Sequence, residues 1–200
     1  TVFALRREIA KIEGRLAERL EAPGEPLDIV RRVGGSASTG QTLLSTGARR
    51  LDMALGGGLQ ANGLTEIHTS ETRDAASAAG FAMALCARMP PIAPVLWIGT
   101  ADIFHEAGLP YAPGIGSRLG IAARRLLVAQ GRRVEDALWI AGEAAGLPDL
   151  AAVVLELRGS PEKLGLTATR SLHRRALLAG RPVFLLRQAG LPQPTAACTR

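Results

Sequence analysis

The sequence predicts an α/β fold in which helices flank a mainly parallel sheet, with an amphipathic helix ahead of this core. From Leu43 onward, short apolar runs alternate with helical patterns, as expected when helices cover both faces of a parallel sheet. Hydrophobic residues make up 47% of the 200 residues, which is enough for one well-buried domain with short appendages. Aromatic residues make up only 4%, so we expect a core of leucine, alanine, valine and isoleucine.

The sequence predicts three parts, namely an N-terminal helix over residues 1–21, a linker over residues 22–41 and a core domain over residues 42–200. Apolar side chains of the first part recur at helical spacing and fall within an arc of about 80°. This narrow stripe needs a cover, which is either the chain's own core or another protein. The linker is rich in proline and glycine, which would let the helix reach a partner. The stripe begins at Val2, and its candidate partner-binding residues are Leu5, Ile9, Ile12, Leu16 and Leu20.

Within the core, apolar runs predict strands at residues 64–68, 95–99, 126–129, 151–157 and 183–187. Helical patterns predict helices near residues 49–55, 72–89, 133–145 and 162–179. Because apolar residues surround the helix at 72–89, we expect it to be buried on nearly every side. Prolines and glycines in residues 101–120 predict a helix interrupted by loops.

Residues 65–77 read T-E-I-H-T-S-E-T-R-D-A-A-S, which predicts the strand, turn and helix of a phosphate-binding loop. In a working loop, G-x-x-x-x-G-K-[ST], glycine amides and a lysine hold the phosphates and a hydroxyl holds Mg²⁺. Here Thr69 and Asp74 stand at the glycine positions, and Ala75 and Ala76 replace the lysine and the hydroxyl. Glu71 would also repel a polyphosphate. A strand-turn-helix that never bound a nucleotide explains these residues equally well. The degenerate loop comprises Thr69, Ser70, Glu71, Thr72, Arg73, Asp74, Ala75 and Ala76.

The surrounding segments resemble the ATPase core of RecA over most of the chain. Residues 44–59 (L-S-T-G-A-R-R-L-D-M-A-L-G-G-G-L) resemble its beginning, and residues 124–140 resemble a later strand, turn and helix. Residues 151–157 match the strand of the Walker B aspartate, and residues 182–188 match the strand that ends in a phosphate-sensing glutamine, here Gln188. Ala101 stands at the catalytic glutamate, with Asp102 one place off, and Glu156 replaces the Walker B aspartate. The resemblance implies a RecA-like core without catalytic residues, nucleotide or other cofactor, or metal.

Further segments resemble the ImuA family, whose members are RecA-like accessory factors of damage-induced mutagenesis in bacteria. They are A-L-R-R-E-I-A-K-I-E-G-R-L-A-E-R-L, H-T-S-E-T-R-D-A-A-S-A-A-G-F-A, P-V-L-W-I and L-T-A-T-R, and the E-T-R-D-A turn is the most specific. This resemblance implies a non-enzymatic role in the SOS response and translesion synthesis. The implied partners are ImuB, a Y-family polymerase relative without catalytic residues, and an error-prone C-family polymerase. RecA, or a second copy docking through the N-terminal helix, is a further implied partner.

Two other functions fit parts of the sequence. A SulA-like inhibitor of cell division is also a RecA relative without a phosphate loop, and it would bind the tubulin-like division protein. The long N-terminal helix and the E-T-R-D-A turn favour the ImuA-like function over this one. A residual ATPase would need an unconventional site, because the activating carboxylate, the lysine and the metal ligands are all replaced.

A net charge of +6 and a pI near 10.5 favour an acidic partner, of which nucleic acid is the usual one. Arginines outnumber lysines 22 to 2, however, which a GC-rich genome would also produce. The segments after the last two predicted strands are a short loop and a proline-containing tail, unlike the long loops of the RecA DNA channel. We therefore expect at most weak, non-specific DNA binding. The candidate contacts to DNA or a partner, which a solvated helix face would also explain, are Arg170, Arg174, Arg175, Arg181 and Arg187.

The remaining features predict a cytoplasmic protein that reaches the nucleoid through its partners. Cys86 and Cys198 provide no disulfide framework, and the three histidines lack the spacing of metal ligands. The sequence has neither an apolar run of membrane-spanning length nor a secretory leader. It ends in T-A-A-C-T-R where relatives continue into further strands, so we expect a core that is trimmed at its C-terminus.

Overall fold

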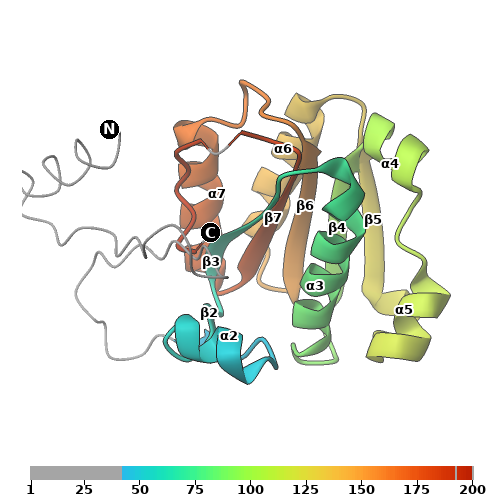
Figure 1. Cartoon of the computed structure of the whole chain (residues 1–200), viewed down its shortest axis with the longest axis vertical. Coiled ribbons are helices and arrows are strands. Elements are labelled where there is room, and N and C mark those ends of the chain that lie inside the picture. Colours follow the sequence, from blue (N-terminus) through green and yellow to red (C-terminus); the bar gives the residue numbers. More distant parts are fainter. Residues whose placement is uncertain (1–41, 192, 200) are drawn as a thin grey trace, which may run out of the picture.

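The computed structural model describes residues 42–191 and 193–199, so the predicted N-terminal helix, its apolar stripe and the linker lie outside the described residues. Helices cover both faces of a parallel five-stranded sheet with strand order β3-β7-β6-β4-β5 (Figure 1). The predicted α/β class is therefore confirmed. In sheet order, the strands are β3 Gly63–Thr69, β7 Pro182–Gln188, β6 Ala152–Arg158, β4 Val95–Thr100 and β5 Leu126–Gly131.

The helices form one layer on each side of the sheet (Figure 1). One face packs against α3 Ala75–Ala87, α4 Ala101–Ala107 and α5 Ala112–Leu119, and the other against α6 Val134–Ala145 and α7 Leu166–Ala179. Before the sheet, α2 Arg49–Ala54 lies between two short antiparallel strands, β1 Leu43–Leu44 and β2 Leu59–Gln60. This strand pair was missed from the sequence, because two-residue strands leave no periodic pattern.

Continuous apolar runs form the central strands because both of their faces are covered. All seven residues of β7 are buried, and so are all residues of β6 except Arg158. Leucine, alanine, valine and isoleucine supply most of the core, as expected. Two aromatic residues, Trp97 and Phe184, nevertheless fill the centre of the face under α3.

Two predicted helices differ from the structure. The predicted helix at residues 72–89 begins with a 3-10 turn, Thr72–Asp74, and the prediction that it is buried on nearly every side is wrong. Ala76, Ser77 and Gly80 are exposed, because α3 contacts the sheet along one side only. The helix predicted from residue 162 begins at Leu166, after a turn in which the Leu164 amide donates to the Pro161 carbonyl.

The C-terminal segment lies along the outer edge of β3. The Cys198 amide donates to the Leu64 carbonyl at 2.8 Å, and the Glu66 amide donates to the Thr199 carbonyl at 2.9 Å. Thr195 and Ala196 are buried. The segment read as a proline-containing tail therefore covers an edge that would otherwise expose unpaired backbone groups. Among the described helices, none has the length and apolar character to cross a membrane.

Candidate functional site

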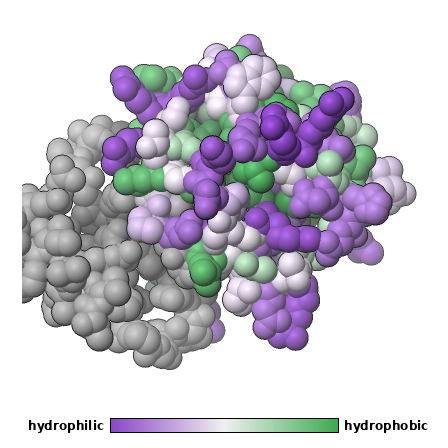
Figure 2. All heavy atoms as spheres, turned by 90° about the horizontal axis from the view of Figure 1, so that it is seen from above, coloured by the Kyte–Doolittle hydropathy of each residue, from purple (hydrophilic) through white to green (hydrophobic). Residues whose placement is uncertain are grey.

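The candidate site lies where β3, β7 and β6 end. The registers place Thr69, Gln188 and Arg158 side by side across these three strands. Ligands of open α/β sheets bind at the carboxyl ends of the strands, which makes this row the natural place for a nucleotide. Figure 2 looks down on this end of the sheet and shows mainly hydrophilic side chains.

The degenerate loop has the predicted strand-turn-helix form. Thr69 ends β3, a 3-10 turn follows, and Ala75 begins α3. The turn is exposed, and its Glu71 and Arg73 pair with each other at 2.8 Å. None of residues 69–76 has a positive φ angle, the conformation that glycines provide in a phosphate-cradling loop. The turn therefore offers a phosphate neither a lysine nor a glycine-built nest of amides.

Beneath the turn, Glu156 is held by the protein's own side chains. Trp97 Nε1 donates to Glu156 Oε2 at 2.8 Å, and Gln188 Nε2 donates to Glu156 Oε1. Burial raises the pKa of Glu156, and these two hydrogen bonds oppose the shift. The glutamine that would sense a phosphate thus contacts a carboxylate of its own chain.

Phe104 fills the neighbouring space. Gly99 is paired with Glu156 across β4 and β6, and a Cβ atom on Gly99 would lie 2.7 Å from Phe104 Cζ. The ring of Phe104 is itself buried. An aromatic ring therefore packs against the strand end that precedes the position of the missing catalytic glutamate, Ala101.

Arg158 interacts with the two other carboxylates of the site, Glu106 and Asp102. Its Nη1 forms an ion pair with Glu106 Oε2 of α4. A hydrogen bond from the Thr100 hydroxyl lowers the pKa of Asp102, and the charge of Arg158 adds to this effect. Within the described residues, no group of three histidine, cysteine or acidic side chains could hold a metal ion. The guanidinium of Arg158 thus supplies the positive charge beside Glu106 and Asp102.

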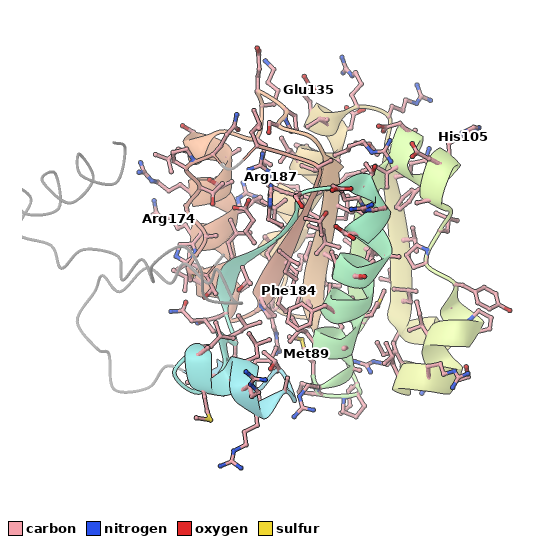
Figure 3. The ribbon with its side chains drawn as sticks, in the orientation of Figure 1. Met89, His105, Glu135, Arg174, Phe184 and Arg187 are labelled. Atoms are coloured by element: carbon pink, nitrogen blue, oxygen red, sulfur yellow. The ribbon has the colours of Figure 1, made fainter. Side chains whose placement is uncertain are left out.

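The predicted arginine cluster is only partly a surface cluster. Arg187 is fully buried, and its Nη1 lies 3.3 Å from Glu66 Oε1, so the prediction that it contacts DNA or a partner is wrong. It lies on the strand face that α6 and α7 cover, which the sequence pattern did not show. Arg181 Nε donates to the Pro148 carbonyl, and Arg175 pairs with Glu143. Figure 3 shows Arg174 projecting outward, whereas Arg187 lies within the fold.

Several residues of the site were missed from the sequence. Trp97 lies in the P-V-L-W-I segment, which was used only as a resemblance, and Phe104 and the pair Arg158–Glu106 come from segments that carry no motif. The only available signal was a charged residue, Arg158, directly after an uninterrupted apolar strand. The contact partners of these side chains are set by strand order, which a single sequence does not display.

Replacing Glu156 with glutamine should flatten the dependence of stability on pH. A carboxyl whose folded pKa is raised above 4.5 stabilises the fold below that pH and loses this contribution as pH rises through the folded pKa. The amide of the substituted side chain cannot ionise. The amide group of Gln188 can rotate by 180° so that its Oε1, which has no hydrogen-bond partner among the described residues, accepts from the new amide.

Denaturant unfolding at about pH 5 and about pH 8 measures this effect. The stability of Glu156→Gln relative to the wild type should increase between these two conditions. The exposed Glu71→Gln serves as the matched control and should show no such trend. If the stability of Glu156→Gln and of the wild type changes with pH in the same way, the pKa of Glu156 is not raised by burial.

Comparison with known proteins supports the fold. No protein-family model and no curated protein matches the chain. Among solved structures, the RadB recombinase matches with a TM-score of 0.53 and 19% sequence identity, covering 73% of this chain and 70% of RadB. SulA from Pseudomonas aeruginosa matches with a TM-score of 0.44 and 20% identity, covering 62% of this chain and 97% of SulA. The match to the RadB recombinase shows that the described core has a RecA-like α/β fold.

Proposed function

We propose that this chain is a non-catalytic, RecA-like accessory protein of damage-induced translesion mutagenesis. It acts by protein-protein contacts with an ImuB-type polymerase relative and an error-prone C-family polymerase. In this role it is a cytoplasmic protein that is brought to the nucleoid by its partners.

The proposal that the protein is non-catalytic rests on one observation. The side chains at the expected nucleotide site contact one another. Gln188 and Trp97 both donate to Glu156, and Phe104 packs against Gly99. A nucleotide would have to break these contacts and dock beside Glu71 and Asp74. Each charge-assisted contact missing from the loop weakens binding by roughly 1.5–3 kcal/mol, and about 1.4 kcal/mol is a tenfold change. Calorimetry with millimolar ATP and Mg²⁺ should therefore detect no binding heat.

The resemblance of the N-terminal segment and the E-T-R-D-A turn to the ImuA family supports the choice of partner. A RecA-like fold by itself does not establish a function. The apolar stripe of residues 2–20 gives the proposal a specific element to test, because an interface needs a buried apolar centre.

Affinity capture from DNA-damaged cells, with the whole chain as bait, tests the proposal. The expected result is recovery of the ImuB-type protein and the error-prone polymerase, with no effect of added ATP. Ile9→Asp with Ile12→Asp should weaken binding by at least roughly a hundredfold, because each isoleucine buried in an interface contributes about 1.5–3 kcal/mol. Lys11→Asp, on the polar side of the expected helix, is the matched control and should leave capture unchanged.

Other outcomes distinguish the alternatives. Recovery of the tubulin-like division protein in place of a polymerase would support the SulA-like function. If the double aspartate variant loses the cooperative unfolding of the core, the stripe packs in cis and is not a partner interface. Saturable binding of ATP and Mg²⁺ would contradict the non-catalytic reading of the site.

A further inference from the structure

One tryptophan of the chain is buried and the other is exposed. Trp97 is 1% exposed, in the core under α3, whereas Trp139 is 69% exposed on α6. Trp139 lies two residues from the buried Ala137 and from the buried Ala141. Two residues correspond to about 200° around a helix, so the indole projects directly away from the sheet. A large exposed aromatic side chain on an ordered helix is a feature of binding surfaces.

Two arginines occupy the equivalent position on the adjacent helix. Arg174 lies two residues from the buried Leu172 and from the buried Ala176 of α7, so it too projects away from the sheet. Arg170 lies one turn before it, and both are exposed. Within the described residues, neither lies within 4 Å of a carboxylate. Their charges are therefore available to a ligand on this face.

A contact between the helices brings the indole and these arginines to the same level. Arg175 Nη1 donates to the Gly142 carbonyl and to Glu143, both at 2.8 Å. Both helices connect the carboxyl end of one parallel strand to the amino end of the next, so they run in the same direction. Trp139 is one turn before Gly142, which places it level with the segment between Arg170 and Arg174. Packed helices are about 8–10 Å apart, a gap that arginine side chains can bridge.

We propose that the outer face of α6 and α7 is a contact site for single-stranded nucleic acid. A base stacks on Trp139, and the flanking phosphates contact Arg170 and Arg174. An unpaired base exposes the face needed for stacking, and arginines hold the phosphates without reading sequence. This site lies on the helical layer and is separate from the carboxyl ends of the strands.

The charges around Trp139 determine the path of the bound nucleic-acid strand. Glu143 is neutralised by Arg175, whereas Glu135, one turn before Trp139, is exposed and repels phosphate. The strand therefore runs from Trp139 across to α7 rather than along α6. The exposed positive charges of Arg170 and Arg174 favour nucleic acid as the occupant of this face.

The purified whole chain and two labelled oligonucleotides, thymidylate and uridylate, of about 15 nucleotides test this proposal. Because Trp97 is buried, quenching of tryptophan emission reports on Trp139. Saturable quenching is expected with both oligonucleotides, since the contacts do not involve the 2′-hydroxyl. By anisotropy, Trp139→Ala should weaken binding at least roughly fivefold, and Trp139→Phe should retain most of the affinity.

Salt dependence separates the contribution of the arginines. Arg170→Ala with Arg174→Ala should reduce the slope of log K against log salt by about 1.4, the value for two single-strand phosphate contacts. Arg118→Ala with Arg124→Ala removes the same charge from the opposite side of the sheet and should leave slope and quenching unchanged. Unquenched emission at saturation, or equal losses from both arginine pairs, would overturn the proposal. The oligonucleotide experiment uses the purified chain without a protein partner. Its failure would therefore leave the proposed function untouched, and failure of the capture experiment would leave this proposal untouched.

Discussion

Replacing Arg187 with methionine should lower the free energy of unfolding by about 3–5 kcal/mol, the cost of breaking a buried ion pair. The guanidinium is fully buried and lies 3.3 Å from Glu66 Oε1. Its Nη2 also donates to Ser160 Oγ at 3.1 Å and to the Leu191 carbonyl at 3.2 Å. Methionine would remove this cation from beside the buried Glu66 carboxylate, which also accepts a hydrogen bond from the Thr195 hydroxyl at 2.7 Å.

Denaturant unfolding of three variants separates charge from volume. Arg187→Met with Glu66→Leu removes both charges and should recover part of the lost stability, because a buried pair can be replaced by apolar residues at little cost. Arg174→Met, on the exposed side of α7, should change stability by less than about 0.5 kcal/mol. If Arg187→Met is no worse than Arg174→Met, Arg187 does not stabilise this part of the fold.

Replacing Gly190 with alanine should destabilise the protein by about 1–3 kcal/mol, through overpacking. A Cβ atom at this position would lie 2.4 Å from the Gly159 carbonyl oxygen and 3.1 Å from Arg187 Nη2. The backbone cannot yield easily there, because the Gly190 carbonyl contacts His68 Nε2 at 2.5 Å. The substitution forces apart the turns that follow β6 and β7.

A second glycine provides the control for this prediction. Gly142 lies inside α6, and a Cβ atom there would meet no heavy atom within 4 Å. Gly142→Ala should therefore stabilise the protein by up to about 1 kcal/mol, through helix propensity alone. Thermal or denaturant unfolding measures both variants, and opposite signs are expected. A Gly190→Ala protein as stable as the wild type would mean that the two turns separate without cost.

The parts of the site that depend on neighbouring residues could be predicted from the sequence. The strand, turn and helix around Thr69–Ala76 follow from a short apolar run, a polar turn and an alanine-rich stretch. The replacement of the lysine and hydroxyl by Ala75 and Ala76 is likewise visible without a structure. Boundaries were less accurate, because Pro161 and Gly165 shape a turn within a segment whose pattern is otherwise helical.

Contacts between distant residues could not be predicted in this way. Trp97 and Glu156 are 59 residues apart, and Gln188 and Glu156 are 32 apart, and each pair meets because β4, β6 and β7 are adjacent in the sheet. Arg187 was placed on the surface for the same reason. A charged residue in a sequence predicts exposure unless its partner is known, and that partner, Glu66, lies 121 residues away.

The amino-acid sequence by itself determined the α/β class, the order of the five sheet strands along the chain and the alanines at the lysine and hydroxyl positions of the loop, since periodicity and residue type are local properties. Tertiary structure alone decided that Glu156 accepts hydrogen bonds from Trp97 and Gln188 and that Arg158 pairs with Glu106. It also decided that Arg187 is buried while Trp139 and Arg174 share one outer face. The physical reason is that burial and pairing depend on which strands and helices are neighbours in space, and strand order brings together residues that are far apart in the chain.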